Sequence, residues 1–183
     1  MELYSREFGQ GSPVLILHGL FGFSDNWQTI AKGLSDQHLV VTPDLRNHGR
    51  SPHVPTHTYA EMADDLRAFM EAALDVQRCR GGAQHGRQSR HATRLVAPGY
   101  GGAPGGGRYC TRCCRRQPFF HFSTPYCEMD LSKMSSRQEA ETYLAERIPD
   151  AGTRQFLLKN ITREEDGRFA WKMNLPVLWE HYR

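Results

Sequence analysis

Short apolar runs alternate with amphipathic stretches along the first 78 residues. Leu3–Phe8 alternates in polarity and predicts an edge strand. Val14–Leu17 and Leu39–Thr42 are largely apolar on both faces, which is typical of interior strands in a parallel sheet. His18-Gly19 and Gly22 follow the first of these runs, and glycine lets the backbone turn sharply near a ligand. Because open α/β sheets bind ligands at strand ends, this turn is the first candidate for a functional site.

Two amphipathic helices are predicted in the same region. Ser24 or Asp25 is expected to cap the first helix. Its apolar face is predicted to contain Trp27, Ile30, Ala31 and Leu34. Thr58 and Glu61 have capping-box spacing for a second helix, which is expected to end at about Leu74. Its buried side is predicted to contain Met62, Leu66, Phe69, Met70 and Ala73. The order strand, strand, helix, strand, helix predicts the beginning of an α/β layered domain.

The last third of the chain, residues 128–183, is predicted to be mainly helical. Ser136 and Glu139 have capping-box spacing, and Pro149 is expected to end the helix that they begin. The apolar stripe of this helix comprises Ala140, Tyr143, Leu144 and Ile148. Two further apolar segments are expected to be short helices or loops that cover an apolar surface, namely Phe156–Leu158 and Phe169–Trp179.

The segment between Cys79 and Cys127 differs in composition from both of its flanks. It contains eight Arg but no Lys, Asp or Glu, together with all five cysteines and nine of the 17 glycines. Without those eight Arg the formal net charge of the chain changes from +3 to −5. Glycine-rich sequence with no acidic residue is unsuited to a packed layer, so we expect this segment to be disordered. Three regions are therefore predicted, with bounds 1–78, 79–127 and 128–183.

Two motifs at a characteristic separation resemble those of the small α/β-hydrolase esterases. The first is His18-Gly19-Leu20-Phe21-Gly22 followed by Asn26-Trp27, and the second is the run from Pro43 to Ser51 with the sequence Pro-Asp-Leu-Arg-Asn-His-Gly-Arg-Ser. Residues 130–183 also resemble the helical cap of that family, notably at Leu131–Lys133 and Ile148–Asp150. The resemblance implies an α/β-hydrolase fold, here incomplete, with a mostly parallel sheet, flanking helices and a helical cap segment.

The resemblance also implies a mechanism and a site. Intact relatives hydrolyse a small carboxylic ester or thioester with a Ser-His-Asp triad and require no metal or organic cofactor. The His18-Gly19 turn would line the oxyanion hole, with one donor N–H from Leu20 or Phe21. The second donor would follow a Ser nucleophile on a G-x-S-x-G elbow. His18 itself is expected to shape the turn rather than act as a general base.

No G-x-S-x-G motif occurs in the chain, so no triad residue is assigned. Gly82–Gln88 can be encoded so that the frame one base later gives Gly-His-Ser-Met-Gly-Gly. The same offset at Pro104–Arg112 permits Leu-Val-Val-Val-Asp-Ile-Ala-Pro-Val. The shifted Ser straddles residues 84 and 85 and the shifted Asp straddles residues 108 and 109, a separation of 24 residues that fits the family. We hypothesise that residues 79–127 are an out-of-frame translation of a hydrolase gene.

The carboxyl-terminal residues and the remaining polar motifs offer weak catalytic candidates. Only Glu180-His181-Tyr182-Arg183 follow Trp179, so His181 is a poor candidate for a triad histidine, and the chain is expected to be truncated relative to the family. Asp44, Arg46 and His48 are expected to make loop hydrogen bonds and salt bridges. Ser51 lacks an adjacent base. We therefore expect no esterase activity from the chain as written.

Three other interpretations apply to the segment 79–127. Cys110-x-x-Cys113-Cys114 has no second ligand pair at zinc-site spacing, so no metal is expected. The eight Arg with Phe119, Phe120 and Tyr126 follow no helix or strand period, so a nucleic-acid surface is not expected. Gly99–Gly107 lacks the context of a phosphate-binding loop. A non-catalytic interaction module remains an alternative, as does, less favourably, a basic nucleic-acid-binding protein.

The amino-terminal residues predict no leader and the chain predicts no membrane span. Met1–Phe8 is polar and lacks an apolar h-region. No apolar run approaches the ~20 residues that a spanning helix needs. A cytoplasmic protein without a membrane partner is therefore expected.

Overall fold

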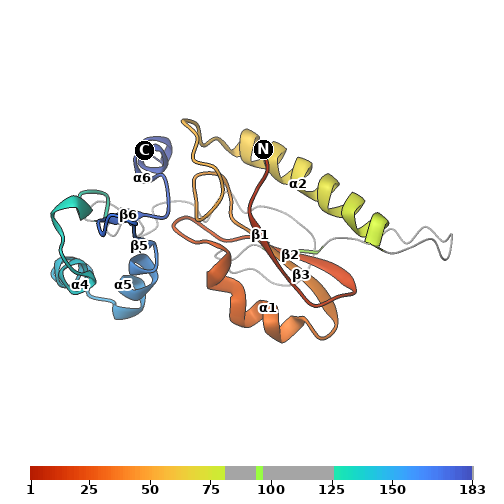
Figure 1. Ribbon diagram of the computed structural model, residues 1–183, viewed down its shortest axis with the longest axis horizontal. Coiled ribbons are helices and arrows are strands. Elements are labelled where there is room, and N and C mark those ends of the chain that lie inside the picture. The colour runs from red at the N-terminus through yellow and green to blue at the C-terminus, as the bar shows by residue number, and fades with distance from the viewer. Residues whose placement is uncertain (81–93, 97–125, 183) are drawn as a thin grey trace, which may run out of the picture. The chain divides into compact units, whose positions relative to one another are not determined.

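The computed structural model of the chain describes residues 1–80, 94–96 and 126–182. These residues fall into two compact units (Figure 1). Unit 1 contains residues 1–80, 94–96 and 173–182, and unit 2 contains residues 126–172. The bounds that the sequence predicts at residues 78 and 127 stay predictions.

A four-stranded sheet organises unit 1. Its order is β1 (Ser5–Phe8), β3 (His38–Pro43), β2 (Ser12–Ile16) and β4 (Arg94–Val96). β1 lies at the edge, antiparallel to β3, whereas β2 is parallel to both β3 and β4. The predicted edge strand and both predicted interior strands are confirmed.

Helices cover the sheet of unit 1 on two faces, because alternate side chains of a strand point in opposite directions. One face carries the cluster Val14, Ile16, Ala31 and Val40, to which helix α1 (Gln28–Leu34) contributes Ala31. The other carries the cluster Leu15, Leu17, Val41 and Leu45, against which helix α2 (Tyr59–Arg80) packs. Figure 1 shows α1 and α2 on opposite sides of the strands. The α/β layered architecture is thus confirmed.

The entry to α1 differs from the predicted cap. A 3-10 turn, η1 (Ser24–Trp27), precedes the helix, and Asn26 Oδ1 accepts the Phe23 N–H at 2.8 Å. The Ser24 N–H instead donates to the buried carboxylate of Asp44, and Asp25 forms an ion pair with Arg6. Neither predicted residue caps α1, because its N-cap position is Trp27, one turn further along the chain. The Ser24 hydroxyl is buried without a hydrogen-bond partner among the described residues.

The predicted apolar face of α1 is only partly correct. Ala31 is fully buried and Trp27 packs against the same cluster. In contrast, Ile30 is 50% exposed and Leu34 is 37% exposed. The short helix meets the sheet along a narrow line, so the positions on either side of Ala31 face away from the core.

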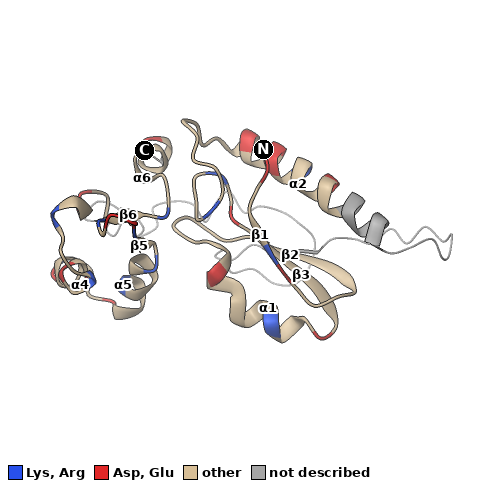
Figure 2. Ribbon diagram, in the orientation of Figure 1, with Lys and Arg blue, Asp and Glu red and all other residues tan. Residues whose placement is uncertain are grey.

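The start of α2 follows the prediction. Thr58 N–H donates to Glu61 Oε2 at 3.0 Å, and Glu61 N–H donates to Thr58 Oγ1 at 3.3 Å, which completes a capping box. The partly buried side chains that pack on the sheet are Met62, Leu66, Phe69 and Met70. The helix continues to Arg80, beyond the predicted end at Leu74. Figure 2 shows acidic residues on its first turns.

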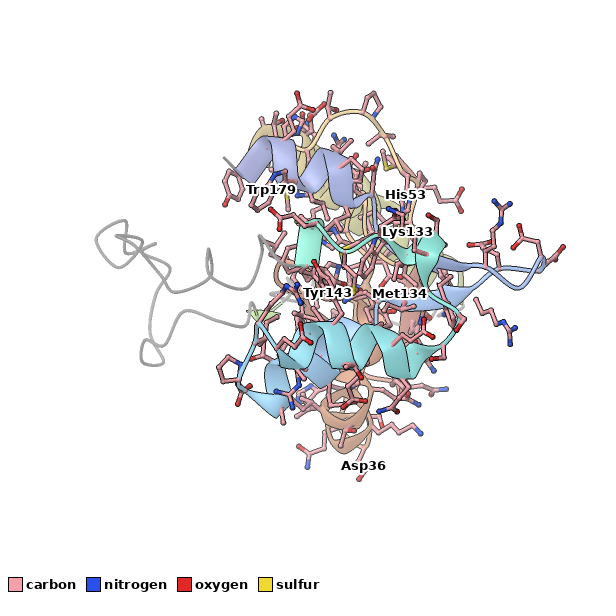
Figure 3. All side chains as sticks on the ribbon, turned by 90° about the vertical axis from the view of Figure 1, so that its left-hand side faces the viewer. Asp36, His53, Lys133, Met134, Tyr143 and Trp179 are labelled. Atoms are coloured by element: carbon pink, nitrogen blue, oxygen red, sulfur yellow. The ribbon has the colours of Figure 1, made fainter. Side chains whose placement is uncertain are left out.

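Unit 2 combines two helices with a hairpin. Its elements are η2 (Leu131–Lys133), α4 (Arg137–Ala145), α5 (Ala151–Leu158), β5 (Ile161–Arg163) and β6 (Phe169–Trp171). Ser136 and Asp150 cap the two helices, accepting the Glu139 and Thr153 N–H groups. The predicted stripe is largely confirmed, since Ala140, Leu144 and Ile148 are at most 1% exposed. Tyr143 on α4 is half-buried under the Arg147 guanidinium (Figure 3).

The hairpin corrects one sequence expectation. Residues 169–171 were expected to be helix or loop, but β6 pairs antiparallel with β5. The Asp166-Gly167 pair at its tip is a strong hairpin signal, and Gly167 has a φ of +86°. Residues Leu175–Tyr182 form helix α6 as part of unit 1.

Candidate active site

The turn that follows β2 has a fixed shape. We call residues 18–23 the turn 18–23. Its Gly22 N–H donates to the Gly19 carbonyl at 2.9 Å, and Phe21 has a φ of +61° although it is not glycine. A Cβ at Gly22 would lie 2.9 Å from the Cβ of His18, so no larger residue fits without a shift. Leu20 is half-buried and Gly19 is exposed. The turn is therefore rigid where it is anchored and open at its tip.

His18 anchors this turn to the next strand. Its Nε2 accepts the Leu45 N–H at 2.9 Å, which requires an unprotonated Nε2. Its Nδ1 lies 2.9 Å from the Gly19 carbonyl and must therefore carry the proton. Burial lowers the pKa of His18, against the opposing effects of the Gly19 hydrogen bond and the Asp44 charge. With both nitrogens committed, His18 has no nitrogen left to act as a general base, which agrees with the shaping role expected of it.

Asp44 organises the segment after β3, which we call loop 44–57. Its Oδ1 accepts the Ser24 N–H at 2.5 Å and its Oδ2 accepts the Arg50 N–H at 2.9 Å. Gly49 approaches the same carboxylate so closely that a Cβ there would lie 2.2 Å from Oδ2. Gly49 also has a φ of +58°, which favours glycine. The carboxylate thus fixes the loop instead of facing a substrate.

Arg46 points from loop 44–57 to the first turns of α2. Its Nε lies 2.6 Å from Asp65 Oδ2 and its Nη1 lies 3.0 Å from Glu61 Oε2. The Asp65 hydrogen bond raises the pKa of Arg46. Hydrogen bonds from Thr56 and Thr58, together with Arg46, lower the pKa of Glu61 to about 2. The expected salt bridges of this loop are therefore present.

Ser51 is also committed to the loop. Its Oγ donates to the Asp44 carbonyl at 2.6 Å and accepts the Tyr4 N–H at 2.9 Å. The side chain is 3% exposed. A serine nucleophile needs a free hydroxyl beside a base, and Ser51 has neither.

Asn47 holds a role that the sequence reasoning missed. It is fully buried with a φ of +64°, and its Oδ1 accepts the Val54 N–H at 2.7 Å. Its carbonyl accepts the Asn174 N–H at 2.9 Å, and its Nδ2 donates to the Thr56 carbonyl at 2.9 Å. These bonds tie loop 44–57 to the segment that leads into α6. The available signal was an Asn two residues before a glycine, since Asn tolerates a left-handed conformation.

Three histidines, one from the turn and two from the loop, lie side by side. The ring centroids of His18 and His48 are 4.9 Å apart, and those of His48 and His57 are 5.6 Å apart. His48 is 2% exposed, and burial places its pKa well below the ordinary value. Burial likewise lowers the pKa of His57 to about 4. All three rings are thus neutral near pH 7.

The other sequence candidates lie outside the described residues. These are the shifted Ser and Asp positions at residues 84–85 and 108–109, the cysteines Cys110–Cys114, the Gly99–Gly107 run, and Phe119 with Phe120. His181 lies on α6, where its Nδ1 is 2.9 Å from the Val177 carbonyl. No helix in the described parts of the chain has the length and apolar character that crossing a membrane requires.

Unit 1 has a buried parallel strand that ends in a glycine-containing turn, and helices cover both faces of its sheet. These features define an α/β protein whose binding position is a strand end. The sequence model of the alpha/beta hydrolase fold matches residues 12–78. The chain is also 32% identical to a marine microorganism esterase, covering 98% of this chain and 71% of that one, with a TM-score of 0.73. It belongs to the α/β-hydrolase fold family.

The relatives that match most of the chain include an esterase and a lipase. The chain is 32% identical over 180 residues to the esterase YbfF of Escherichia coli (strain K12), covering 93% of this chain and 65% of the relative. It is 32% identical over 187 residues to the sn-1-specific diacylglycerol lipase ABHD11 of Xenopus laevis, covering 93% of this chain and 57% of the relative. The chain thus spans less than two thirds of the length of these two relatives.

Proposed function

We propose that this chain derives from a serine esterase and retains half of its oxyanion hole in the turn 18–23. The observation that carries this proposal is the Leu20 N–H, which is accepted by no residue in the described part of the chain. It stands on a rigid turn at the end of a parallel strand. A fixed N–H of this kind stabilises the oxyanion of acyl transfer by about 3 kcal/mol. Leu20 is therefore favoured over Phe21 as the donor, with His18 and Gly19 shaping the turn.

We further propose that the chain as written does not hydrolyse esters. The 183 residues contain no G-x-S-x-G motif. Ser24 and Ser51 offer no substitute, because Ser24 is 1% exposed and Ser51 bonds to Asp44 and Tyr4. One oxyanion donor without a nucleophile gives no covalent route. In the intact family the substrate would be a small carboxylic ester or thioester.

The reading-frame hypothesis explains why the nucleophile is missing. The family match ends at residue 78, directly before the segment of altered composition. Tyr126 bears on the other boundary, since it is fully buried in unit 2, donates to the Leu157 carbonyl and packs edge-on to Trp171. A side chain that fits its core this closely supports a return to the original frame before Tyr126. This would shorten the out-of-frame segment from the 79–127 expected from the sequence.

Two expressed chains test the proposal. The first is the chain as written, and the second re-encodes the segment from codon 79 to codon 125 in the frame one base later. With a short-chain p-nitrophenyl ester, we expect background hydrolysis from the first. The second should gain a Gly-His-Ser-Met-Gly sequence and a sharper cooperative thermal transition. Serine-dependent hydrolysis by the chain as written would refute the inactivity, and coding DNA without the shifted sequences would refute the frame hypothesis.

A further inference from the structure

The contact between His18 and His48 joins two segments that are far apart in the sequence. His18 belongs to the turn 18–23 after β2, and His48 belongs to loop 44–57 after β3. Their rings are 4.9 Å apart, and neither residue is more than 5% exposed. The Leu45 N–H bond to His18 Nε2 makes a second link between the same two segments. Both links depend on neutral imidazole rings.

Protonation of His18 would place two donors against each other. Nδ1 already donates to the Gly19 carbonyl, so an added proton must go to Nε2. Nε2 lies 2.9 Å from the Leu45 nitrogen, whose hydrogen points at it. The carboxylate that acts on His18 is that of Asp44, and its two oxygens already accept the Ser24 and Arg50 N–H groups. A charged His18 therefore breaks the link to loop 44–57.

Protonation of His48 would bury an unpaired charge. Its Nδ1 lies 2.9 Å from the Arg46 carbonyl, which assigns the proton of the neutral ring to that nitrogen. Its Nε2 is buried, and no described residue lies within hydrogen-bonding distance of it. The ionisable groups that face this ring are His18, His53 and His57, and each would add a like charge at acid pH. The charged groups that act on His57 include His181, Arg46 and Glu61. Of these three, only the Glu61 carboxylate favours protonation of His57.

We propose that His18 and His48 form an acid-sensitive latch, which holds the turn 18–23 against loop 44–57 and opens when the imidazoles are protonated. The opening is local, because the cluster of Val14, Ile16, Ala31 and Val40 contains no titratable side chain. Acid therefore releases the turn and the loop while the strands stay packed. This inference does not rest on the proposed function, since it concerns the conformation of unit 1 with or without catalysis.

The titration of the individual imidazoles is the primary test. The chain contains nine histidines, and the exposed His53, which Figure 3 labels, provides an internal reference. With isotope-labelled full-length protein, NMR titration from pH 8 to pH 4 should give midpoints for His18 and His48 below that of His53. Amide exchange of Leu45 should accelerate over the same range, before exchange of Val40. If His18 and His48 titrate together with His53, the latch is refuted.

A pair of variants separates the latch from general acid destabilisation. His48→Asn keeps an amide donor for the Arg46 carbonyl but cannot gain a proton, and His53→Asn removes an exposed histidine from the same loop. A histidine that stays neutral only in the folded state raises the unfolding equilibrium constant about 30-fold between pH 7.5 and pH 5. His48→Asn should reduce the acid dependence by that factor, whereas His53→Asn, which removes the weakest of the three like charges that act on His48, should change it far less. Equal dependence in both variants would overturn the proposal.

Discussion

The turn 18–23 and loop 44–57 follow adjacent parallel strands but use their polar groups in opposite ways. The polar groups of loop 44–57 form hydrogen bonds within the protein, as Asp44, Asn47 and Ser51 each bond to at least two partners. In the turn, the Leu20 N–H lies at a half-buried tip and no residue in the described ranges accepts it. A group that binds a ligand must have no hydrogen-bond partner in the free protein. The loop therefore has a structural role, and the turn is the candidate site. The cluster of charged residues in the loop is therefore a poor guide to catalysis.

The largest expected effect on this comparison comes from Asp44→Asn. The amide would present a donor to either the Ser24 or the Arg50 N–H, leaving a buried donor unsatisfied in a residue that is 1% exposed. We expect a loss of about 3 kcal/mol in the free energy of unfolding, measured with urea. Asp36→Asn is the matched control, because Asp36 (labelled in Figure 3) is exposed. Similar stabilities for the two variants would show that Asp44 does not organise the loop.

Asn47→Ala is expected to have the next largest effect. It removes the partners of the Val54 N–H and the Thr56 carbonyl, and it places Ala at a φ of +64°. A loss of about 2 kcal/mol follows from the unsatisfied groups and the strain. Asn174→Ala and the double variant complete a thermodynamic cycle measured in urea. Both variants keep the backbone bond from the Asn174 N–H to the Asn47 carbonyl, so the cycle measures the 3.3 Å bond from Asn174 Nδ2 to Asn47 Oδ1. A coupling energy near zero would mean that this side-chain bond adds no stability.

Asn47 also marks the limit of what the sequence could predict. Strands β1 to β3 and the start of α2 were predictable, since an alternating run, two continuous apolar runs and a capping box are local signals. The exposed Ile30 and the hairpin at β6 were missed. Exposure of Ile30 depends on how a short helix meets the sheet, and the hairpin depends on the turn at Asp166-Gly167. The bonds between Asn47 and Asn174 join positions far apart in the chain, and no local pattern encodes them.

The same limit applies to the candidate site. The motif His18-Gly19 could be assigned from the resemblance, because its glycines and strand context are local. The choice between Leu20 and Phe21 could not, since it depends on which N–H the surrounding backbone leaves open. The commitment of Ser51 likewise required the position of Tyr4 on the neighbouring segment. Sequence therefore located the turn, whereas the proposal of Leu20 as its donor depends on three-dimensional contacts.

Ser51→Ala should have an intermediate effect. The hydroxyl donates to the Asp44 carbonyl and accepts the Tyr4 N–H, and its loss leaves both buried groups unsatisfied. We expect a loss of about 1–2 kcal/mol in the free energy of unfolding by urea. Ser35→Ala is the control, because Ser35 makes only an exposed bond to the Lys32 carbonyl and should change stability by less than about 0.5 kcal/mol. Equal losses would place Ser51 outside the supporting network.

The smallest effect is expected at the outer end of the loop network, at Glu61. Hydrogen bonds from Thr56 and Thr58 lower the pKa of Glu61 from 4.5 to about 2. A carboxyl with a lowered folded-state pKa binds its proton more readily when unfolded, so it stabilises the fold above pH 4.5. That stabilisation is lost as the pH falls from 4.5 through about 2.

Glu61→Gln should flatten this part of the pH profile of thermal unfolding without altering the profile above pH 5. Glu71→Gln, at an exposed position further along α2, is the control and should leave the profile unchanged. If Glu61→Gln also left it unchanged, the anchoring of loop 44–57 to α2 would rest on the Arg46–Asp65 pair alone.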